Sequence, residues 1–77
     1  MGSKYPSLKS SEITKRLMQF GFVFKSQKGS HAKFVKHVAG FPTRTVIVPM
    51  HDEVSKWTLQ KILLQAGLSL EEFLNAP

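Results

Sequence analysis

The sequence predicts an α+β fold in which helices cover one face of a three-stranded antiparallel sheet. Three observations predict this class. Apolar residues recur with helical spacing near both ends of the chain, they alternate with other residues in its middle, and the connections between the alternating segments are short. The order of helix, three strands, helix and short final helix lets two layers bury their apolar faces against each other as an α-β-β-β-α sandwich.

The first helix is predicted over residues 11–20. Ser10 or Ser11 can cap its start, and Glu12 suits the positive end of the helix dipole. Gly21 stands where a left-handed residue commonly ends a helix. The apolar face of this helix occupies positions i, i+4 and i+7, which are Ile13, Leu17 and Phe20.

Three strands follow, because apolar and polar residues alternate in this part of the chain. The middle strand turns Ala32 and Phe34 to one face and its odd-numbered residues, from His31 to His37, to the other. Pro49 ends the third strand because it has no N–H to give to a sheet. The strands are predicted over residues 22–27, 31–37 and 43–48, joined by a turn at Lys28, Gly29 and Ser30 and by a Gly/Pro loop over residues 38–42.

A second helix is predicted to run from its N-cap Ser55 through Ala66, and Gly67 ends it. Ser69 and Glu72 form a capping box, because a serine and a glutamate three residues later can each satisfy the other's backbone N–H. This box begins a short terminal helix. The apolar faces of the two helices are Leu59, Ile62, Leu63 and Ala66 in the first, and Leu70, Phe73 and Leu74 in the second.

The 77 residues allow a single domain, residues 1–77, in which we expect residues 1–9 to be a disordered lead-in. The predicted two-layer layout resembles that of double-stranded-RNA-binding domains. A layout by itself says little about function, so function has to be sought in particular residues.

The chain is strongly basic, with eleven Lys and Arg against five Asp and Glu and a net charge of +6. This surplus favours a polyanionic partner, usually nucleic acid, although it also attracts acidic proteins. The alternative is an ordinary solubilising surface. The lack of cysteine excludes disulfides and thiolate metal sites and fits a reducing cytoplasm. Because no apolar run approaches the roughly 20 residues of a membrane span, we expect a cytoplasmic protein without membrane association.

The tripeptide Gly29-Ser30-His31 concentrates the reactive groups of the chain. A histidine can give or accept a proton near neutral pH, and RNA carries its own nucleophile in the 2′-OH. Lys28 and Lys33 can stabilise charge that develops on a phosphate. The backbone N–H groups of Gly29 and Ser30 can hold a phosphate oxygen at the turn. The alternative is that His31 is a turn residue hydrogen-bonded to the backbone.

His37 and His51 are candidates for a second proton-transfer group. His37 shares a strand face with His31, but six residues of strand span about 20 Å, so a solvent-exposed His37 is the better interpretation. His51 follows the third strand and can come nearer, although a structural role in the loop is favoured. The separation of the histidines argues against a zinc site. Only Asp52 and Glu53 adjoin before the last helix, which argues against a magnesium nuclease, so we expect no metal and no cofactor.

Further basic residues lie on or beside the predicted strands and are the expected phosphate contacts, each adding salt-dependent affinity. Lys56 and Lys61 of the second helix can add to such a surface. Trp57 can stack on a base, seat against a partner or cover the edge of the core, and the sequence does not decide between these roles. The basic residues associated with the strands are Lys25, Lys28, Lys33, Lys36 and Arg44.

Four groups of residues form an ordered pattern along the chain: Phe20-Gly21-Phe22; Lys28-Gly29-Ser30-His31 with Phe34; Val46-Ile47-Val48-Pro49 with His51; and Thr58-Leu59-Gln60-Lys61-Ile62-Leu63 continuing through Gln65-Ala66-Gly67-Leu68-Ser69. In this order and spacing they resemble the HicA toxins, which are small mRNA interferases of HicA–HicB toxin–antitoxin systems. The resemblance covers residues 10–74.

The resemblance implies a fold like that of double-stranded-RNA-binding domains, metal-independent cleavage of mRNA that blocks translation, and a HicB antitoxin that masks the active site. The essential histidine of the family falls on His31. The chain departs from the family at Ala32, where many members have a second histidine, at His37, which lies one residue further along, and at Trp57, where a small residue is common. The alternative functions are a non-catalytic RNA-binding module and an interaction module for an acidic protein.

Overall fold

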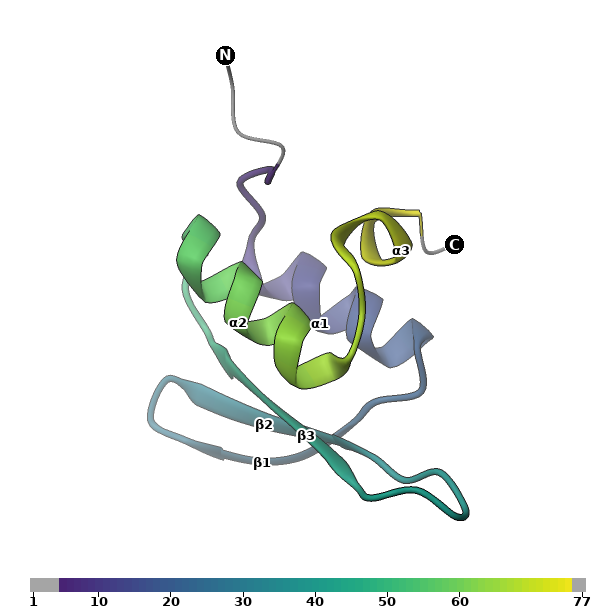
Figure 1. Ribbon diagram of the computed structural model, residues 1–77. Coiled ribbons are helices and arrows are strands. Elements are labelled where there is room, and N and C mark those ends of the chain that lie inside the picture. Colours follow the sequence, from purple (N-terminus) through teal and green to yellow (C-terminus); the bar gives the residue numbers. More distant parts are fainter. Residues whose placement is uncertain (1–4, 76–77) are drawn as a thin grey trace.

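Three antiparallel strands form one sheet, and the helices of the described chain lie on the same side of it (Figure 1). The computed structural model describes residues 5–75. The strand order is β1-β2-β3, so the central strand pairs with both neighbours. The elements are α1 (Ser10–Gln19), β1 (Val23–Lys28), β2 (His31–Lys36), β3 (Arg44–Pro49), α2 (Lys56–Ala66) and α3 (Leu70–Leu74).

The predicted fold class, a two-layer α+β sandwich with an antiparallel three-stranded sheet and a short final helix, is confirmed. The predicted strands and the first two helices begin and end within one residue of the observed ones. Pro49 is the last residue of β3, where it pairs with His31, rather than the first residue after the strand. A proline is tolerated at this position because the end of an edge strand needs no further N–H for the ladder.

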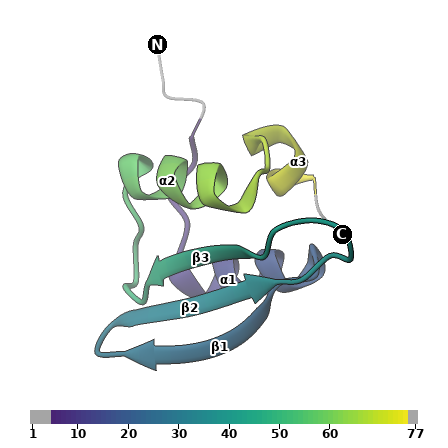
Figure 2. The same cartoon turned by 60° about the horizontal axis from the view of Figure 1, so that its bottom comes forward.

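The core lies between the sheet and the helices (Figure 2). Side chains of β2 and β3 contribute to it, whereas those of β1 do not. Every residue of β1 is exposed, so the predicted helix cover does not extend to this edge strand. Burial of apolar surface from β2, β3 and the helices is the main force that holds the layers together. The largest fully buried side chains are Phe22, Phe73, Ile13, Leu17, Leu59, Ile62, Val46 and Val48.

A β-bulge at Lys25 changes the face of the sheet on which the later side chains of β1 lie. Before the bulge, Phe24 pairs with Phe34, and after it Lys28 pairs with His31. Directly opposed residues of an antiparallel pair share a face, and a bulge inserts one extra residue into one strand. Strict alternation from Phe24 would turn Lys28 toward the helices, whereas the bulge turns it to the face that carries His31.

Two side chains show that face and burial are separate properties. Alternation places Phe22 and Phe24 on one face, yet Phe22 is buried while Phe24 is 54% exposed. Phe24 lies on β1 beyond the helix cover and packs edge-on against Phe34, with ring centroids 5.8 Å apart. Val35 shows the opposite case. It lies on the helix-free face but is buried, because it occupies the central strand between neighbours on β1 and β3.

The start of α1 differs from the predicted cap. The N-cap is Lys9, and the Oε1 atom of Glu12 accepts a hydrogen bond of 3.2 Å from the Lys9 N–H. Ser10 lies inside the helix, where its N–H donates to the carbonyl oxygen of His51 at 3.2 Å. The prediction that Ser10 or Ser11 caps the helix is therefore wrong, because a distant loop supplies an acceptor that local sequence cannot reveal.

The chain before α1 packs on the rest of the protein. Leu8 is buried and forms an isolated antiparallel bridge with Val54, whose N–H donates to the Leu8 carbonyl at 2.8 Å. The expectation of a disordered lead-in over residues 1–9 is therefore wrong for residues 5–9, where an apolar side chain reaches the core. Residues 1–4 lie outside the described residues.

The predicted ends of α2 are confirmed. The Ser55 hydroxyl accepts a hydrogen bond of 3.2 Å from the Thr58 N–H, and Gly67 ends the helix with a left-handed φ of 72°. Gly21 likewise has a positive φ, of 94°, just after α1. These glycines occupy the left-handed region that other residues rarely adopt.

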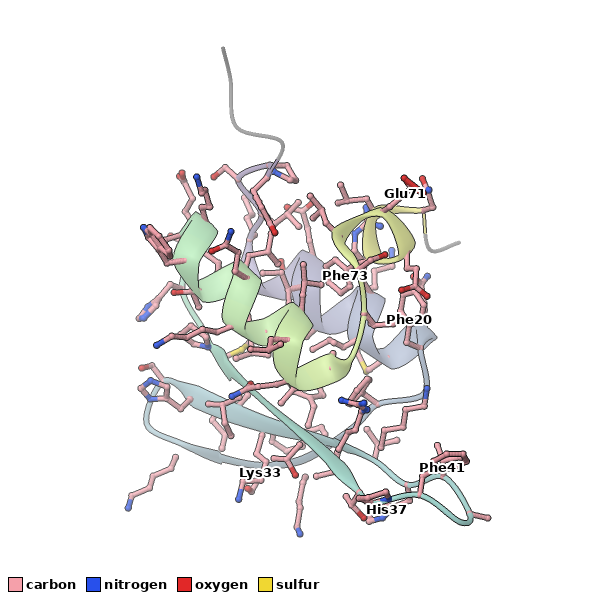
Figure 3. The ribbon with its side chains drawn as sticks, viewed as in Figure 1. Phe20, Lys33, His37, Phe41, Glu71 and Phe73 are labelled. Atoms are coloured by element: carbon pink, nitrogen blue, oxygen red, sulfur yellow. The ribbon has the colours of Figure 1, made fainter. Side chains whose placement is uncertain are left out.

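Helix α3 is held by its capping box and by contacts with α1. Ser69 Oγ accepts from the Glu72 N–H at 3.0 Å, and Glu72 Oε1 accepts from the Ser69 N–H at 2.9 Å, which confirms the predicted box. The buried ring of Phe73 stacks on Phe20 with centroids 6.4 Å apart (Figure 3). The Arg16 guanidinium donates to the Phe73 carbonyl at 3.1 Å, so it binds the end of α3.

Two adjacent leucines on α2 allow a test of which face of this helix packs against the core. Leu63 is 4% exposed and Leu64 is 81% exposed. We expect Leu63→Ala to lower the free energy of unfolding by about 2–5 kcal/mol, because it leaves a cavity in the core. Leu64→Ala is the matched control and should change it by less than about 0.5 kcal/mol. Urea denaturation followed by circular dichroism measures both, and equal effects would contradict the assigned orientation of α2.

Acid should weaken the capping box of α3. The hydrogen bond from the Ser69 backbone N–H lowers the pKa of Glu72 below its ordinary value of 4.5. Because the folded pKa lies below the unfolded one, the box stabilises the fold above pH 4.5, and this contribution is lost as the pH falls through the folded pKa. We expect Glu72→Gln to lose less thermal stability than the parent protein on acidification below pH 4.5.

The control for this prediction is Glu71→Gln, on the same turn of α3. Within residues 5–75 the Glu71 carboxylate makes no hydrogen bond, so this variant should keep the acid dependence of the parent protein. Melting temperatures across the acidic range, measured by circular dichroism, give the comparison. The same acid dependence in Glu72→Gln and in the parent protein would contradict a role for the box.

Candidate active site

His31 is the first residue of β2 and directly follows the hairpin turn at Gly29 and Ser30. Gly29 has a φ of 58°, whereas Ser30 has no positive φ, and this combination is typical of a type II′ hairpin turn. A Cβ at Gly29 would meet no atom within 4 Å, so backbone conformation rather than lack of space favours glycine here. The Gln27 side-chain amide donates to the Gly29 carbonyl at 3.0 Å and braces the turn.

Two lysines share the helix-free face of the sheet with His31. Lys28 is the cross-strand partner of His31 in β1, and Pro49 is its partner in β3. Lys33 lies two residues further along β2 and therefore on the same face. His31 and Lys28 are exposed and Lys33 is partly buried. The structure thus brings an imidazole and two ammonium groups to one open surface.

The loop after β3 also reaches the hairpin turn. The Met50 N–H donates to the Ser30 carbonyl at 2.6 Å, which ties this loop to the turn that carries His31. His51 comes next in the chain, and its N–H donates to the Pro49 carbonyl at 3.0 Å. His51 therefore lies at the same end of the sheet as His31.

His37 lies beyond the other end of β2. Its Nδ1 atom is 2.9 Å from the Thr43 hydroxyl across the β2–β3 connection. The full length of β2 separates it from His31, as the spacing predicted. The sheet therefore brings His51, and not His37, toward the end that carries His31.

The predicted phosphate contacts divide into two groups. Lys36 and Arg44 are cross-strand partners at the far end of β2 and β3, where Arg44 Nη1 donates to the Gln65 carbonyl at 3.3 Å. Both therefore face the helices, while Lys25 occupies the bulge of β1. The predicted residues that gather around His31 are Lys28, Gly29, Ser30 and Lys33.

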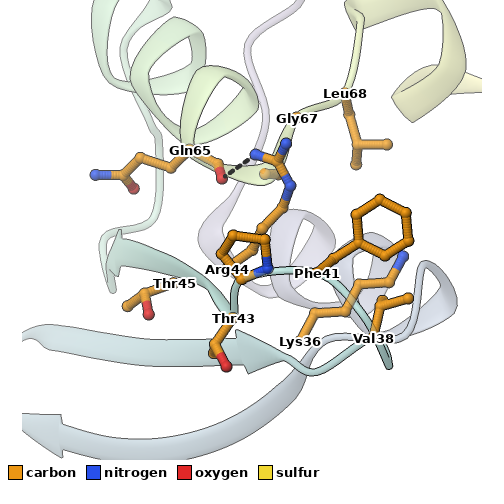
Figure 4. Close-up of a pocket in the computed structure, with 11 residues that line it drawn as sticks. Lys36, Val38, Phe41, Thr43, Arg44, Thr45, Gln65, Gly67 and Leu68 are labelled. Atoms are coloured by element: carbon orange, nitrogen blue, oxygen red, sulfur yellow. Dashed lines mark hydrogen bonds between the residues drawn. The ribbon is translucent and has the colours of Figure 1, made fainter.

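A cavity of about 510 Å³ opens beside Lys36 and Arg44, between the β2–β3 loop and the end of α2 (Figure 4). Phe41 contributes to its lining and is 72% exposed. Phe41 is not among the candidate site residues predicted from the sequence. Its only sequence signal is an aromatic residue in a Gly/Pro loop, where no pattern of burial accounts for it.

Trp57 does not cover the edge of the core. Its side chain is 73% exposed at the start of α2, and the Lys56 Nζ atom lies 5.9 Å from the centre of its ring. The remaining interpretations, base stacking and contact with a partner, stay predictions. Both need an exposed ring, which the structure provides.

The group around His31 suits acid–base chemistry on a phosphate ester, because an exposed imidazole stands beside cations on an open surface. Among residues 5–75, His, Asp and Glu form no group of three or more that could share a metal ion. The described helices include none with the length and apolar character needed to cross a membrane.

Comparison with known proteins identifies the family. The family model of the HicA toxin of bacterial toxin–antitoxin systems matches residues 10–68, from the start of α1 to just after α2. A search of curated proteins found no match. The matched segment includes the whole sheet, the hairpin turn and His31. The chain therefore belongs to the HicA family of toxins of bacterial toxin–antitoxin systems.

Proposed function

We propose that this toxin is a metal-independent endoribonuclease that cleaves mRNA and thereby blocks translation, with His31 as its general acid or base. The observation that carries the proposal is the placement of His31 at a braced hairpin turn, with Lys28 as its cross-strand partner on the helix-free face. Membership in a toxin family supports the same function. The protein would act in the cytoplasm, where its substrate is found.

The chemistry needs few groups, because RNA supplies its own nucleophile. A base removes the proton of a 2′-OH, and the oxygen attacks the adjacent phosphorus. An acid then protonates the departing 5′-oxygen. His31 takes one of these two proton transfers, which an imidazole can perform near neutral pH. The products are a 2′,3′-cyclic phosphate, or its hydrolysed form, and a 5′-OH end.

The lysines stabilise the negative charge of the phosphate as the transition state forms. Lys28 and Lys33 share the face of His31, so both ammonium groups can reach a phosphate held there. The backbone N–H groups of Gly29 and Ser30 add donors at the turn. Lys25, at the bulge, extends the positive surface along β1 and adds salt-dependent affinity for the RNA backbone.

The antitoxin partner, a HicB-like protein, would block this chemistry by covering the helix-free face. Within residues 5–75 no helix covers that face, so His31 is accessible in the isolated chain. An acidic surface on the antitoxin would complement the net charge of +6 and favour rapid association.

Substitution of His31 tests the proposed activity. We expect His31→Ala to lower the rate of RNA cleavage by roughly 10²–10⁴-fold, because it removes one proton-transfer group. Cleavage by the parent protein should persist with excess EDTA. Gel electrophoresis of a labelled single-stranded RNA, with chemical analysis of the ends formed, measures both expectations.

The matched control is His37→Ala, which removes a histidine at the other end of β2 and should leave the cleavage rate unchanged. RNA binding without any cleavage by the parent protein would contradict the proposal and favour the non-catalytic binding module. Cleavage that stops with EDTA would contradict metal independence.

We propose His51 as the second proton-transfer group, because the Met50–Ser30 hydrogen bond ties its loop to the turn before His31. We expect His51→Ala to slow cleavage by roughly a hundredfold and to remove one limb of the bell-shaped dependence of kcat on pH. A stopped-time cleavage assay across the neutral pH range measures this profile. A slower enzyme whose pH profile keeps both limbs would show that His51 has only a structural role.

A further inference from the structure

The cavity between the β2–β3 loop and the end of α2 contains a pair of adjacent cations. Lys36 and Arg44 are direct cross-strand partners, and both line the cavity. Like charges placed directly opposite each other repel and destabilise a sheet. Within residues 5–75 neither cation has a carboxylate partner. A bound anion would remove this repulsion.

The position of Arg44 is set by its surroundings. Its guanidinium donates to the Gln65 carbonyl at 3.3 Å and lies against the backbone of Gly67. A Cβ at position 67 would be only 2.5 Å from the Arg44 Cζ atom, so the guanidinium would have to move away from any other residue there. Lys36 is also placed by packing, because its Nζ atom lies 5.8 Å from the centre of the buried Phe22 ring. Both cations thus line the cavity in the absence of any ligand.

An exposed apolar surface accompanies these charges. Phe41 is 72% exposed, and Val38, which also lines the cavity, is 44% exposed. Figure 4 shows the Phe41 ring at the cavity, which Lys36 and Leu68 also line. A flat exposed ring beside two cations has the chemistry that binds one nucleotide of a single strand, with the base on the ring and the phosphate on the cations.

We propose that this cavity is a second RNA subsite, in which Phe41 stacks on a base and Lys36 and Arg44 bind the adjoining phosphate. The inference rests on the proposed ribonuclease function and names where the rest of the RNA strand binds. From His31 to Lys36 the strand β2 spans about 17 Å. An RNA strand bound at His31 would continue over Lys33 and past the end of the sheet to reach Phe41. The subsite therefore binds nucleotides that are distant from the phosphate that is cleaved.

Fluorescence anisotropy with an RNA that cannot be cut tests this subsite. The probe is a labelled single-stranded RNA of about 12 nucleotides, within the usual range of single-strand sites, whose 2′-hydroxyls are methylated. We expect Phe41→Ala to weaken binding roughly tenfold, because it removes one base stack. Leu64→Ala removes an equally exposed apolar side chain outside the cavity and should leave the affinity unchanged.

The charge contribution is tested separately through salt. We expect Arg44→Gln to reduce the slope of the logarithm of affinity against the logarithm of salt concentration by about 0.7, the value for one phosphate contact on a single strand. Lys15→Gln, an exposed cation of α1 outside the cavity, is the control for net charge. Thermal melting verifies that Arg44→Gln is folded. An unchanged slope in this folded variant overturns the phosphate contact.

The outcomes separate the subsite from the proposed function. Loss of affinity in Phe41→Ala supports the subsite even if the parent protein cuts no RNA, a result that would overturn only the nuclease proposal. Cleavage that depends on His31, together with unchanged RNA affinity in Phe41→Ala, overturns the subsite and leaves the function standing. Weaker binding of the antitoxin by Phe41→Ala, with unchanged RNA affinity, also overturns it and assigns the cavity to a protein partner.

Discussion

Burial of only one face of the sheet is the constraint on which the rest of this structure depends. Among residues 5–75 the helices α1, α2 and α3 all lie on one side of the sheet, and none of them covers the opposite face. The apolar side chains of the sheet therefore gather beneath α1 and α2. The other face carries His31, Lys28 and Lys33 beside apolar residues such as Val35, and the chemistry proposed for this toxin takes place there.

The same constraint gives the candidate site a rigid support. His31 belongs to the central strand, whose next residue Ala32 is buried in the core, so the backbone at the site cannot shift without disturbing the core. The turn before it is braced by Gln27 on one side and by the Met50 N–H on the other. A reactive side chain on a loop end that a packed scaffold holds in place is a common arrangement in enzymes.

Both ends of the β2–β3 pair carry positive charge, but for different physical reasons. At the hairpin end Lys28 and Lys33 accompany His31 on the open face. At the far end Lys36 and Arg44 face the helices, where they lie near Phe22 and Gly67 and line a cavity. Strand β2 runs between the two positive regions, which lie on opposite faces of the sheet, so the proposed RNA path passes around the end of the sheet.

The sequence by itself determined the features that depend on neighbours a few residues apart. Helical spacing, the Ser55 cap, the Ser69–Glu72 box and the Gly67 helix end are local, and each is found where it was predicted. Only the tertiary structure decided which of the predicted phosphate-binding residues lie beside His31. The bulge at Lys25 brought Lys28 to that face, and the pairing with Lys36 placed Arg44 on the opposite one. A one-residue slip in register reverses the face of every later side chain, and register depends on pairing between distant segments, which no local pattern contains.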